Sequence, residues 1–147
     1  MAAPGPRPAL LLVALLVALL AWPAEAQRET RHEKFLRQHV DFPQTRAPDA
    51  RRYCNLLMAR RNLTAPACKP TNTFLHAPAA AVDAVCGAGG SPSTENFHDS
   101  TAAFLLTVCR LDGGRPSPPC SYRGRVTTQR VRLACIRGVP VHFKGQL

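Results

Sequence analysis

The sequence lacks the features that mark zinc-binding domains, membrane proteins and repeat proteins. It contains no CxxC pair and no close cysteine–histidine spacing, so it offers none of the usual structural zinc sites. After Ala21, no apolar run is long enough to cross a bilayer. No segment is repeated elsewhere in the chain. We therefore expect a single soluble domain that needs no metal or other cofactor.

Acidic residues and lysines are also scarce. Nine Asp and Glu residues stand against 19 Lys and Arg residues, which gives a net charge of +10. Only Lys34, Lys69 and Lys144 are lysines, so the positive charge is mostly arginine, whose guanidinium fork suits phosphate. This charge favours polyanionic partners, but it does not separate RNA from heparin, anionic lipid or bacterial surfaces.

The first residues have the pattern of a secretory signal peptide. Arg7 precedes an apolar run from Ala9 to Ala21, and Ala24-Glu25-Ala26 offers a cleavage site. We expect residues 1–26 to be removed and residues 27–147 to form one secreted domain.

Six cysteines in a small secreted chain predict a disulfide framework. Six cysteines allow 15 pairings, and their positions alone do not choose among them. The cysteines are Cys54, Cys68, Cys86, Cys109, Cys120 and Cys135.

Helix signals come first along the chain and strand signals come later, which predicts an α+β fold with antiparallel strands. We expect helices over 30–40, 50–61 and 78–85, with Tyr53, Leu56 and Leu57 facing inward on the second. The glycine-rich segment 87–93 predicts a flexible loop. The expected extended segments are 71–76, 102–109, 120–128, 131–136 and 139–143.

Three distant residues could together cleave RNA without a metal. RNA carries its own nucleophile, the 2′-hydroxyl, so cleavage needs a base, an acid and a cation for the phosphoryl charge. His39 and His142 suit the two proton transfers, and Lys69 suits the charge. Each residue alone is more often structural or solvent-exposed, so the argument depends on all three occurring together.

The contexts of these residues resemble the pancreatic ribonuclease (RNase A) superfamily. The matching segments are Lys34 to His39, Cys68 to Phe74 and Pro140 to Phe143. The resemblance implies a bent fold with three helices packed on antiparallel sheet. It implies His39 as general base, His142 as general acid and Lys69 as transition-state stabiliser. It also implies substrate contacts from Gln38, Asn72, Thr73 and Phe143, and disulfides Cys54–Cys109, Cys68–Cys120 and Cys86–Cys135.

Within the superfamily, the chain is similar to the angiogenin branch and to non-mammalian leukocyte ribonucleases. Residues 87–108 contain no cysteine, whereas most pancreatic-type members have an additional disulfide there. The segments 52–54 and 109–123 resemble the angiogenin branch, and residues 39–43 resemble the leukocyte enzymes.

Two departures from the family pattern affect the expected active site. The residue two after the acid histidine is normally an Asp that orients the imidazole, and here it is Lys144, so we expect weaker catalysis. Angiogenins obstruct the pyrimidine pocket with a Gln three residues after the same histidine. Gly145 stands at that position and Gln146 is displaced by one, so we expect an open pocket.

Two further departures concern uptake by cells. The nuclear-import run of angiogenins has three arginines, whereas here only Arg60 and Arg61 remain, followed by the glycosylation sequon at Asn62. The segment matching the cell-binding loop, 87–96, contains no Lys or Arg. Nuclear delivery and receptor binding are therefore not expected from these segments.

The remaining histidines have ordinary structural interpretations. We expect His76 to be structural, and His32 and His98 to be exposed. The paired arginines 51–52 and 60–61 fit either phosphate subsites or a solvated helix face.

Three functions are compatible with the sequence. The first is a secreted endoribonuclease that cleaves RNA on the 3′ side of pyrimidines through a 2′,3′-cyclic phosphate. The second is a cationic antimicrobial protein that acts on anionic microbial membranes. The third is an angiogenic ribonuclease that cleaves tRNA. We expect a monomer with RNA as its main partner. The sequence leaves open two further partners, an anionic cell surface or microbial membrane and the intracellular ribonuclease inhibitor.

Overall fold

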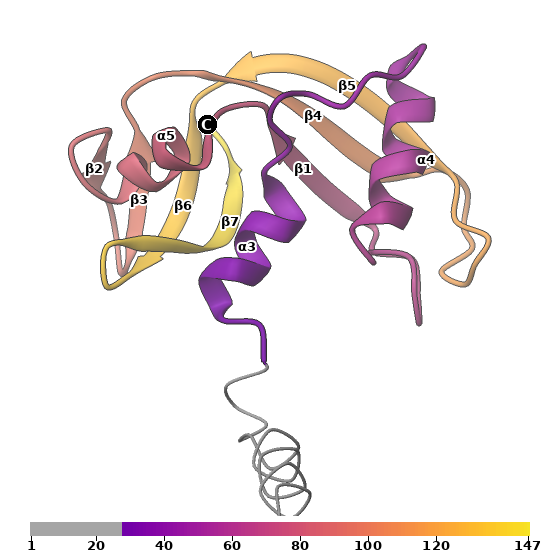
Figure 1. Ribbon diagram of the computed structural model, residues 1–147, viewed down its shortest axis with the longest axis horizontal. Helices are drawn as coiled ribbons and strands as arrows, with labels where there is room; N and C mark the ends of the chain where they lie inside the picture. Colours follow the sequence, from indigo (N-terminus) through magenta and orange to yellow (C-terminus); the bar gives the residue numbers. More distant parts are fainter. Residues whose placement is uncertain (1–27) are drawn as a thin grey trace, which may run out of the picture.

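A computed structural model describes residues 28–147 and has a bent α+β fold (Figure 1). A three-stranded sheet in the order β1-β4-β5 forms one arm of the bend, and a four-stranded sheet in the order β2-β3-β6-β7 forms the other. All strand pairs within the two sheets are antiparallel. The strands are β1 (Thr71–Leu75), β2 (Gly90–Pro92), β3 (Phe97–Ser100), β4 (Phe104–Leu111), β5 (Tyr122–Gln129), β6 (Val131–Ile136) and β7 (Val139–Gln146).

Within residues 28–147, three helices accompany the sheets, as the sequence predicts. They are α3 (Arg31–His39), α4 (Ala50–Arg60) and α5 (Ala79–Asp83), and a 3₁₀ turn at Ala84–Cys86 continues the last of them. In the part of the chain that the structure describes, no helix is long and apolar enough to cross a bilayer. The predicted signal peptide, residues 1–26, lies outside the described residues.

A capping box begins helix α3 and places His39 on its last turn. The Thr30 hydroxyl accepts a hydrogen bond from the Glu33 N–H at 3.0 Å, and the Glu33 carboxylate accepts one from the Thr30 N–H at 3.0 Å. Phe35 and His39, one turn apart, are the buried residues of the helix. Since α3 packs against β1 and β7, this buried face lies against both strands.

Helix α4 packs on one face of the β1-β4-β5 sheet. The Asp49 carboxylate caps it by accepting a hydrogen bond from the Arg52 N–H at 2.8 Å. The approach to β5 is close, because a Cβ at Gly124 would lie 2.4 Å from the Ala50 carbonyl oxygen. Only glycine therefore fits at this position of β5.

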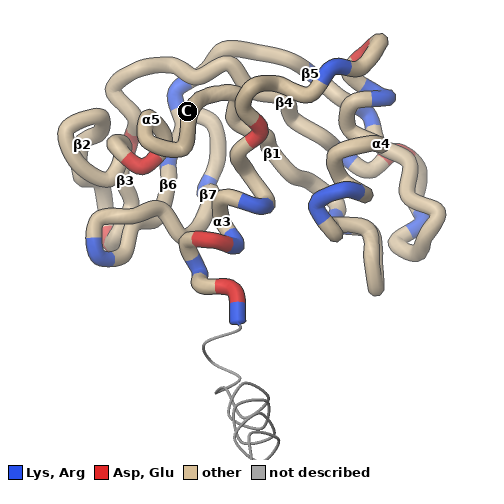
Figure 2. Tube along the Cα trace, in the orientation of Figure 1, with Lys and Arg blue, Asp and Glu red and all other residues tan. Residues whose placement is uncertain are grey.

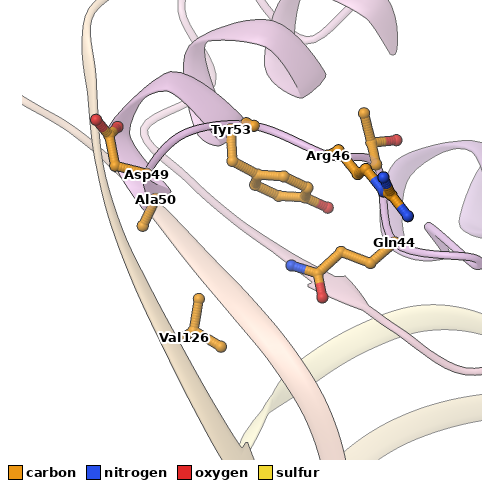
Figure 3. A pocket seen from close by; sticks show the side chains of 8 residues that line it. Gln44, Arg46, Asp49, Ala50, Tyr53 and Val126 are labelled. Carbon is orange, nitrogen blue, oxygen red and sulfur yellow. The ribbon is translucent and has the colours of Figure 1, made fainter.

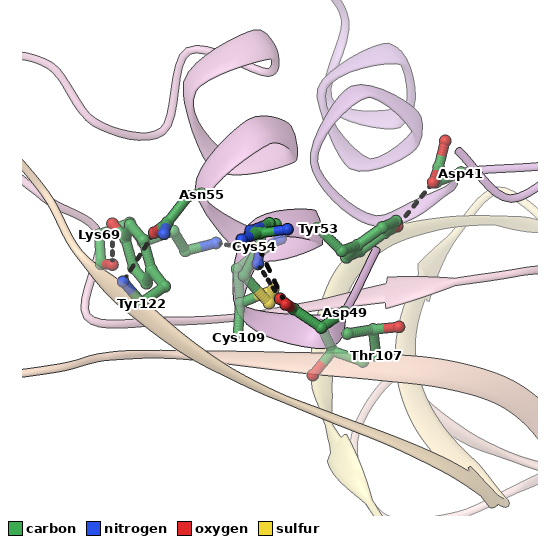
Figure 4. The surroundings of a disulfide bond; sticks show 12 residues. Asp41, Asp49, Tyr53, Cys54, Asn55, Lys69, Thr107, Cys109 and Tyr122 are labelled. Atoms are coloured by element: carbon green, nitrogen blue, oxygen red, sulfur yellow. Dashed lines mark hydrogen bonds and ion pairs between the residues drawn. A yellow bond between two sulfur atoms is a disulfide. The ribbon is translucent and has the colours of Figure 1, made fainter. Parts of the chain in front are cut away.

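The buried face of α4 differs in one detail from the prediction. Tyr53, Leu57 and Met58 are buried, whereas Leu56 is only partly covered. With the Cys54–Cys109 disulfide, these side chains form a core between α4 and the sheet (Figure 4). A second core lies beneath α3 and α5 and contains Phe35, Leu75, Val82, Val85, Leu106, Val108, Val131 and Leu133.

Three disulfides connect distant parts of the chain. They join Cys54 to Cys109, Cys68 to Cys120 and Cys86 to Cys135, the pairs that the family resemblance implies. The sequence separations are 55, 52 and 49 residues. In the chain-entropy model each loop of this size contributes about 4 kcal/mol, a large share of the net stability of a small domain.

The prediction of a flexible loop over 87–93 was wrong. Residues Gly90–Pro92 form strand β2, which pairs with β3 in a hairpin. A Cβ at Gly90 would lie 2.1 Å from the Val85 carbonyl oxygen, so glycine is needed for this close packing. The glycines that suggested flexibility here allow a tight backbone contact.

Candidate active site

A cavity of about 530 Å³ brings together most of the predicted site residues. It lies where α3, the segment that leads into β1, and β7 converge, and a smaller hollow of about 280 Å³ shares His39 and His142 with it. The fold thus joins three segments that are far apart in sequence. The larger cavity is lined by Lys34, Gln38, His39, Lys69, Thr71, Thr73, His142, Phe143, Lys144, Gly145 and Gln146.

His39 is held in the tautomer that leaves one ring nitrogen free to accept a proton. Its Nδ1 lies 2.8 Å from the Thr73 carbonyl oxygen. Because a carbonyl oxygen can only accept, Nδ1 carries the hydrogen and Nε2 carries the lone pair. The ring lies between Phe35 and Phe143, with centroid distances of 5.2 and 5.3 Å.

The surroundings of His39 also favour its neutral form. Only 6% of the residue is exposed, and this burial lowers the pKa of His39 to about 3. The hydrogen bond to Thr73 opposes the shift, whereas the neighbouring Lys69 and His142 add to it. At neutral pH the imidazole is therefore uncharged, the state that a general base requires.

Lys69 is positioned by a chain of hydrogen bonds that runs back to α3. Its Nζ donates to Asn72 Oδ1 at 2.8 Å, and Asn72 Nδ2 donates to the Gln38 carbonyl oxygen at 2.7 Å. An ammonium group has three hydrogens, so two remain for a ligand. Burial, followed by the charges of Lys34 and Arg37, lowers the pKa of Lys69.

Asn72 contributes to the site from behind. It is 2% exposed and is not among the cavity-lining residues. Its side-chain amide connects Lys69 to the backbone of Gln38. In this arrangement Asn72 is a positioning residue, and any substrate contact of its side chain would require these bonds to break.

His142 and Phe143 enter the cavity from β7. His142 is exposed, and among residues 28–147 no carboxylate pairs with it. At the position expected for an orienting Asp, the Lys144 ammonium lies 5.4 Å from the centre of the Phe97 ring. The side chain of Lys144 thus contacts β3 and supplies no acceptor to the imidazole.

The expectation of an open pyrimidine pocket was wrong. Gln146 Nε2 donates a hydrogen bond to the Thr73 hydroxyl at 3.2 Å, across the cavity. Two register irregularities between β6 and β7 change the alternation of side chains along β7, so counting from His142 does not predict which residue reaches Thr73. Gln146, rather than Gly145, therefore forms the hydrogen bond with the Thr73 hydroxyl.

The other histidines lie outside the cavity. His76 is buried, as expected for a structural residue: Nδ1 donates to the Asp41 carbonyl oxygen at 3.0 Å, and Nε2 lies 2.8 Å from the Thr107 hydroxyl. His32 and His98, which we expected to be exposed, are both partly buried. His32 Nδ1 contacts a backbone carbonyl oxygen of β7 at 3.0 Å, which explains its partial burial.

Arg61 is a structural residue that connects α4 to the end of α3. Its guanidinium donates to the carbonyl oxygens of Arg37 and Val40 at 2.7 and 2.8 Å, and it lies 3.4 Å from the Asp41 carboxylate. The Asp41 carboxylate also accepts a hydrogen bond from the Tyr53 hydroxyl at 2.6 Å (Figure 4). Arg61 is therefore engaged within the fold.

The neighbouring arginines and Asn62 are more exposed. Arg51 lies 2.8 Å from Asp112, and Arg52 lies 3.8 Å from Asp49. Asn62 is exposed and has a φ of 60°, a left-handed conformation that asparagine tolerates better than most residues. Its position is accessible to a glycan, although the turn alone is enough to explain an asparagine.

A second cavity, of about 490 Å³, lies between the segment before α4 and strand β5 (Figure 3). Its lining includes Gln44, Arg46, Tyr53 and Val126. It contains neither a histidine nor a lysine, so it offers no acid–base pair near neutral pH. Within residues 28–147 no cluster of three or more His, Cys, Asp or Glu side chains could hold a metal ion.

Comparisons with known proteins find relatives over most of the chain. Residues 30–144 match the family described as "Pancreatic ribonuclease". A ribonuclease of Chelonia mydas is 60% identical over 115 residues, which are 78% of this chain and 97% of that protein. Ribonuclease CL2 of Gallus gallus is 48% identical over 119 residues, 80% of this chain and 97% of that protein.

An angiogenin of Mus musculus is 44% identical over 140 residues, which are 95% of this chain and 92% of that protein. The crystal structure of green turtle egg white ribonuclease superimposes with a TM-score of 0.80 at 58% identity. The match covers 81% of this chain and all of that one. The chain belongs to the pancreatic ribonuclease family.

Proposed function

We propose that this protein is a secreted endoribonuclease that cleaves RNA on the 3′ side of pyrimidines. Residues 27–147 form its single mature domain. The observation that carries the proposal is the state of His39. Its Nδ1–H is committed to the Thr73 carbonyl oxygen, so Nε2 is free to accept a proton in a cavity shared with Lys69 and His142. A base, a cation and a second imidazole are the groups that the reaction needs.

In the first step, His39 Nε2 takes the proton of the 2′-hydroxyl, and the 2′-oxygen attacks phosphorus. Lys69 stabilises the negative charge that gathers on the non-bridging phosphoryl oxygens. His142 gives its proton to the departing 5′-oxygen, so the bond from phosphorus to that oxygen breaks. The products are a free 5′-hydroxyl and a 2′,3′-cyclic phosphate.

In the second step the two histidines exchange roles. His142, now neutral, takes a proton from water, and the water oxygen attacks the cyclic phosphate. His39, now protonated, returns a proton to the 2′-oxygen and leaves a 3′-phosphate. DNA lacks the 2′-hydroxyl and is not a substrate for this route.

Base selection is assigned to Thr73 and Phe143. The Thr73 hydroxyl can donate or accept a hydrogen bond, so it suits both uracil and cytosine. The Phe143 ring, which stacks on His39, offers an apolar surface beside the base. Gln146 donates a hydrogen bond to the Thr73 hydroxyl, so a pyrimidine must displace the Gln146 side chain before it binds. This displacement lowers the apparent affinity for substrate.

Two features support a modest rate of turnover. His142 has no orienting carboxylate within the described residues, because Lys144 stands at that position and contacts Phe97. The lowered pKa of His39 makes it a weaker base than an imidazole titrating near neutrality.

The test compares His39→Ala and His142→Ala with the unmodified protein on tRNA and on a uridine-containing dinucleotide. His98→Ala is the control, because His98 lies on β3 and outside the cavity. Both active-site variants should lose at least about a hundredfold in kcat/KM while remaining folded at the assay temperature, as circular dichroism would show. Full activity of either variant would reject the assigned roles.

Similarity to angiogenins favours a second candidate, an angiogenic ribonuclease that acts on tRNA. Nuclear uptake, which such a role could involve, is disfavoured by two features. The Arg61 guanidinium is held in hydrogen bonds to backbone carbonyl oxygens, and a glycan at the Asn62 sequon would cover the neighbouring arginines. Retained angiogenesis by His142→Ala would separate signalling from catalysis. Killing of bacteria by the same inactive variant would instead favour the antimicrobial alternative that the net charge of +10 allows.

A further inference from the structure

The cavity of about 490 Å³ beside β5 lies on a part of the surface that the proposed reaction does not use. It shares no lining residue with the catalytic cavity. One side is formed by the segment 44–50 and the other by Val126 of β5, and the Gln44 amide projects into the space between Tyr53 and Val126 (Figure 3). We call this cavity, with its lining from Gln44 to Ala50, Tyr53 and Val126, the β5 groove.

One buried carboxylate holds the wall of the β5 groove in place. Asp41, which is 4% exposed, accepts hydrogen bonds from the Thr45 N–H at 3.0 Å and from the Thr45 hydroxyl at 2.9 Å. It also accepts the 2.6 Å hydrogen bond from the Tyr53 hydroxyl. Because Thr45 and Tyr53 are fixed by the same group, the groove is formed before a ligand binds, which lowers the entropic cost of binding.

Exposed apolar side chains adjoin the β5 groove. Val126 is 49% exposed although it is a large aliphatic residue, and Leu105 on β4 is 43% exposed. Val126 pairs with Thr107, which is two residues from Leu105, so Leu105 and Val126 are diagonal neighbours on one face of the sheet. The groove and these two side chains therefore offer a continuous apolar strip to a ligand.

The backbone of β5 has unpaired groups beside this strip. β5 is the last strand of the β1-β4-β5 sheet, and the Asp112 N–H donates to the Ser121 carbonyl oxygen at 2.7 Å. Hydrogen-bonded pairs alternate along an antiparallel ladder, so counting from that pair turns the N–H and C=O of Val126 and Thr128 away from β4. Within residues 28–147, no other strand pairs with these groups.

Helix α4 closes the first part of the same edge. The Tyr122 N–H, which also points away from β4, donates to Asn55 Oδ1 at 2.8 Å. Gly124 lies against the Ala50 carbonyl oxygen. The open part of the edge is therefore limited to Val126 and Thr128, and it begins at the β5 groove.

The charges around the groove favour an acidic ligand. Arg46 and Arg125 are exposed, and within residues 28–147 neither forms an ion pair. Asp49 lines the groove, but its carboxylate caps α4 and lies 3.8 Å from the Arg52 guanidinium. Figure 2 shows further basic positions along α4. The rim is therefore positively charged and complementary to carboxylates.

A second copy of this chain is a poor occupant of the edge. Two β5 strands paired edge to edge would bring the exposed arginines Arg123 and Arg125 of both copies into one sheet, where like charges destabilise pairing. Each copy also carries a net charge of +10. RNA matches the charge of the rim, but it has no row of peptide groups to complete the edge.

We propose that the β5 groove and the open edge of β5 form a docking site for an extended acidic segment of another protein. The segment adds a strand beside Val126 and Thr128. Its alternate side chains face opposite sides of the sheet, so aliphatic ones enter the groove and carboxylates lie on the side of Arg125. Strand addition of this kind takes affinity from main-chain hydrogen bonds and specificity from alternate side chains.

The test uses a synthetic peptide as the probe and the mature protein as its receptor. The peptide has about seven residues, the usual length of a strand, in which glutamate alternates with valine, and it carries a fluorophore. Two further peptides are N-methylated, one at every valine and the other at every glutamate. Only one of these sets of N–H groups can face β5 in an added strand, so the two sets should differ in effect.

Fluorescence anisotropy should show saturable binding of the unmethylated peptide with a Kd below about 1 mM. One methylated peptide should bind at least about tenfold more weakly, whereas the other should stay within about threefold, because each methyl group removes a main-chain donor only where that donor faces β5. Equal affinities of the three peptides, an equal loss for both methylated ones or no saturable binding would overturn the proposal.

A protein variant locates the peptide. Val126→Asp places a negative charge in the groove, and Ser91→Asp is the matched control because Ser91 is exposed on β2, outside the groove. Val126→Asp should bind the unmethylated peptide at least about tenfold more weakly than Ser91→Asp, because it introduces repulsion and removes the apolar contact. Equal affinities of the two variants would place the peptide elsewhere and reject the site.

Two further measurements separate the alternative occupants. Saturating peptide should leave cleavage of a uridine dinucleotide unchanged, and inhibition would mean that the peptide binds in the catalytic cavity and that the proposal is wrong. The protein alone should sediment as a monomer. A dimer that Val126→Asp dissociates would show that the edge accepts a second copy, which would also overturn the proposal.

Discussion

Removal of the Gln146 side chain should increase the activity of this protein on small pyrimidine substrates. Gln146 Nε2 donates a 3.2 Å hydrogen bond to the Thr73 hydroxyl, the group assigned to read the base. A neutral hydrogen bond of this kind contributes a net stabilisation of about 0.5–1.5 kcal/mol. Since each 1.4 kcal/mol is a factor of ten, Gln146→Ala should raise kcat/KM by about 2- to 12-fold.

The division of this gain between KM and kcat is also predicted. The pyrimidine must displace Gln146 before it binds, and the same displacement is needed in the ground state and in the transition state. KM should therefore fall while kcat changes little. The assay is the initial rate of cleavage of a uridine dinucleotide, followed over a range of substrate concentrations.

Two controls make the result specific to the contact with Thr73. Gln44→Ala removes an exposed glutamine that does not line the catalytic cavity and should leave both constants unchanged. In a Thr73→Ala background, Gln146→Ala should give no gain, because the hydroxyl that it obstructs is gone. An unchanged kcat/KM for Gln146→Ala, or an equal gain in the Thr73→Ala background, would refute the obstruction.

Three further predictions follow from the same geometry. Because burial lowers the pKa of His39, kcat/KM should fall on the acidic side with a midpoint well below pH 6.5. The midpoint of the kcat profile should lie at a higher pH, because the bound phosphate favours the protonated ring. A kcat/KM midpoint at or above pH 6.5 would contradict the burial argument. Lys144→Asp should raise turnover of the dinucleotide by supplying an acceptor for His142, whereas unchanged or lower turnover would show that the orienter is not limiting. Replacement of Cys86 and Cys135 by Ser should cost up to about 4 kcal/mol in the free energy of unfolding, measured by denaturant titration, and a loss below about 1 kcal/mol would argue against the loop-entropy account.

The helices and the catalytic segments were predictable because local signals specify them. Thr30 and Glu33 form a capping box, which their spacing of three residues makes readable in the sequence, and that box sets the turn on which His39 lies. The apolar positions of α4 and the β-rich run that leads from Lys69 into β1 are likewise readable over a few residues. These local elements place the three catalytic candidates on α3, beside β1 and on β7.

The errors have long-range causes. The register irregularities in β7 arise from pairing with β6, so the sequence near His142 does not reveal that Gln146 reaches Thr73. The β2–β3 hairpin depends on the close contact between Gly90 and Val85, which no local pattern reports.

The central claim is that a 2′-hydroxyl, activated by His39, is the nucleophile. The most direct measurement follows a uridine dinucleotide by ³¹P NMR while the protein cleaves it. The account predicts that a 2′,3′-cyclic phosphate accumulates before the 3′-phosphate, and that His39→Ala suppresses both products. Cleavage of the matching 2′-deoxy substrate, or a 3′-phosphate formed with no cyclic precursor, would contradict it.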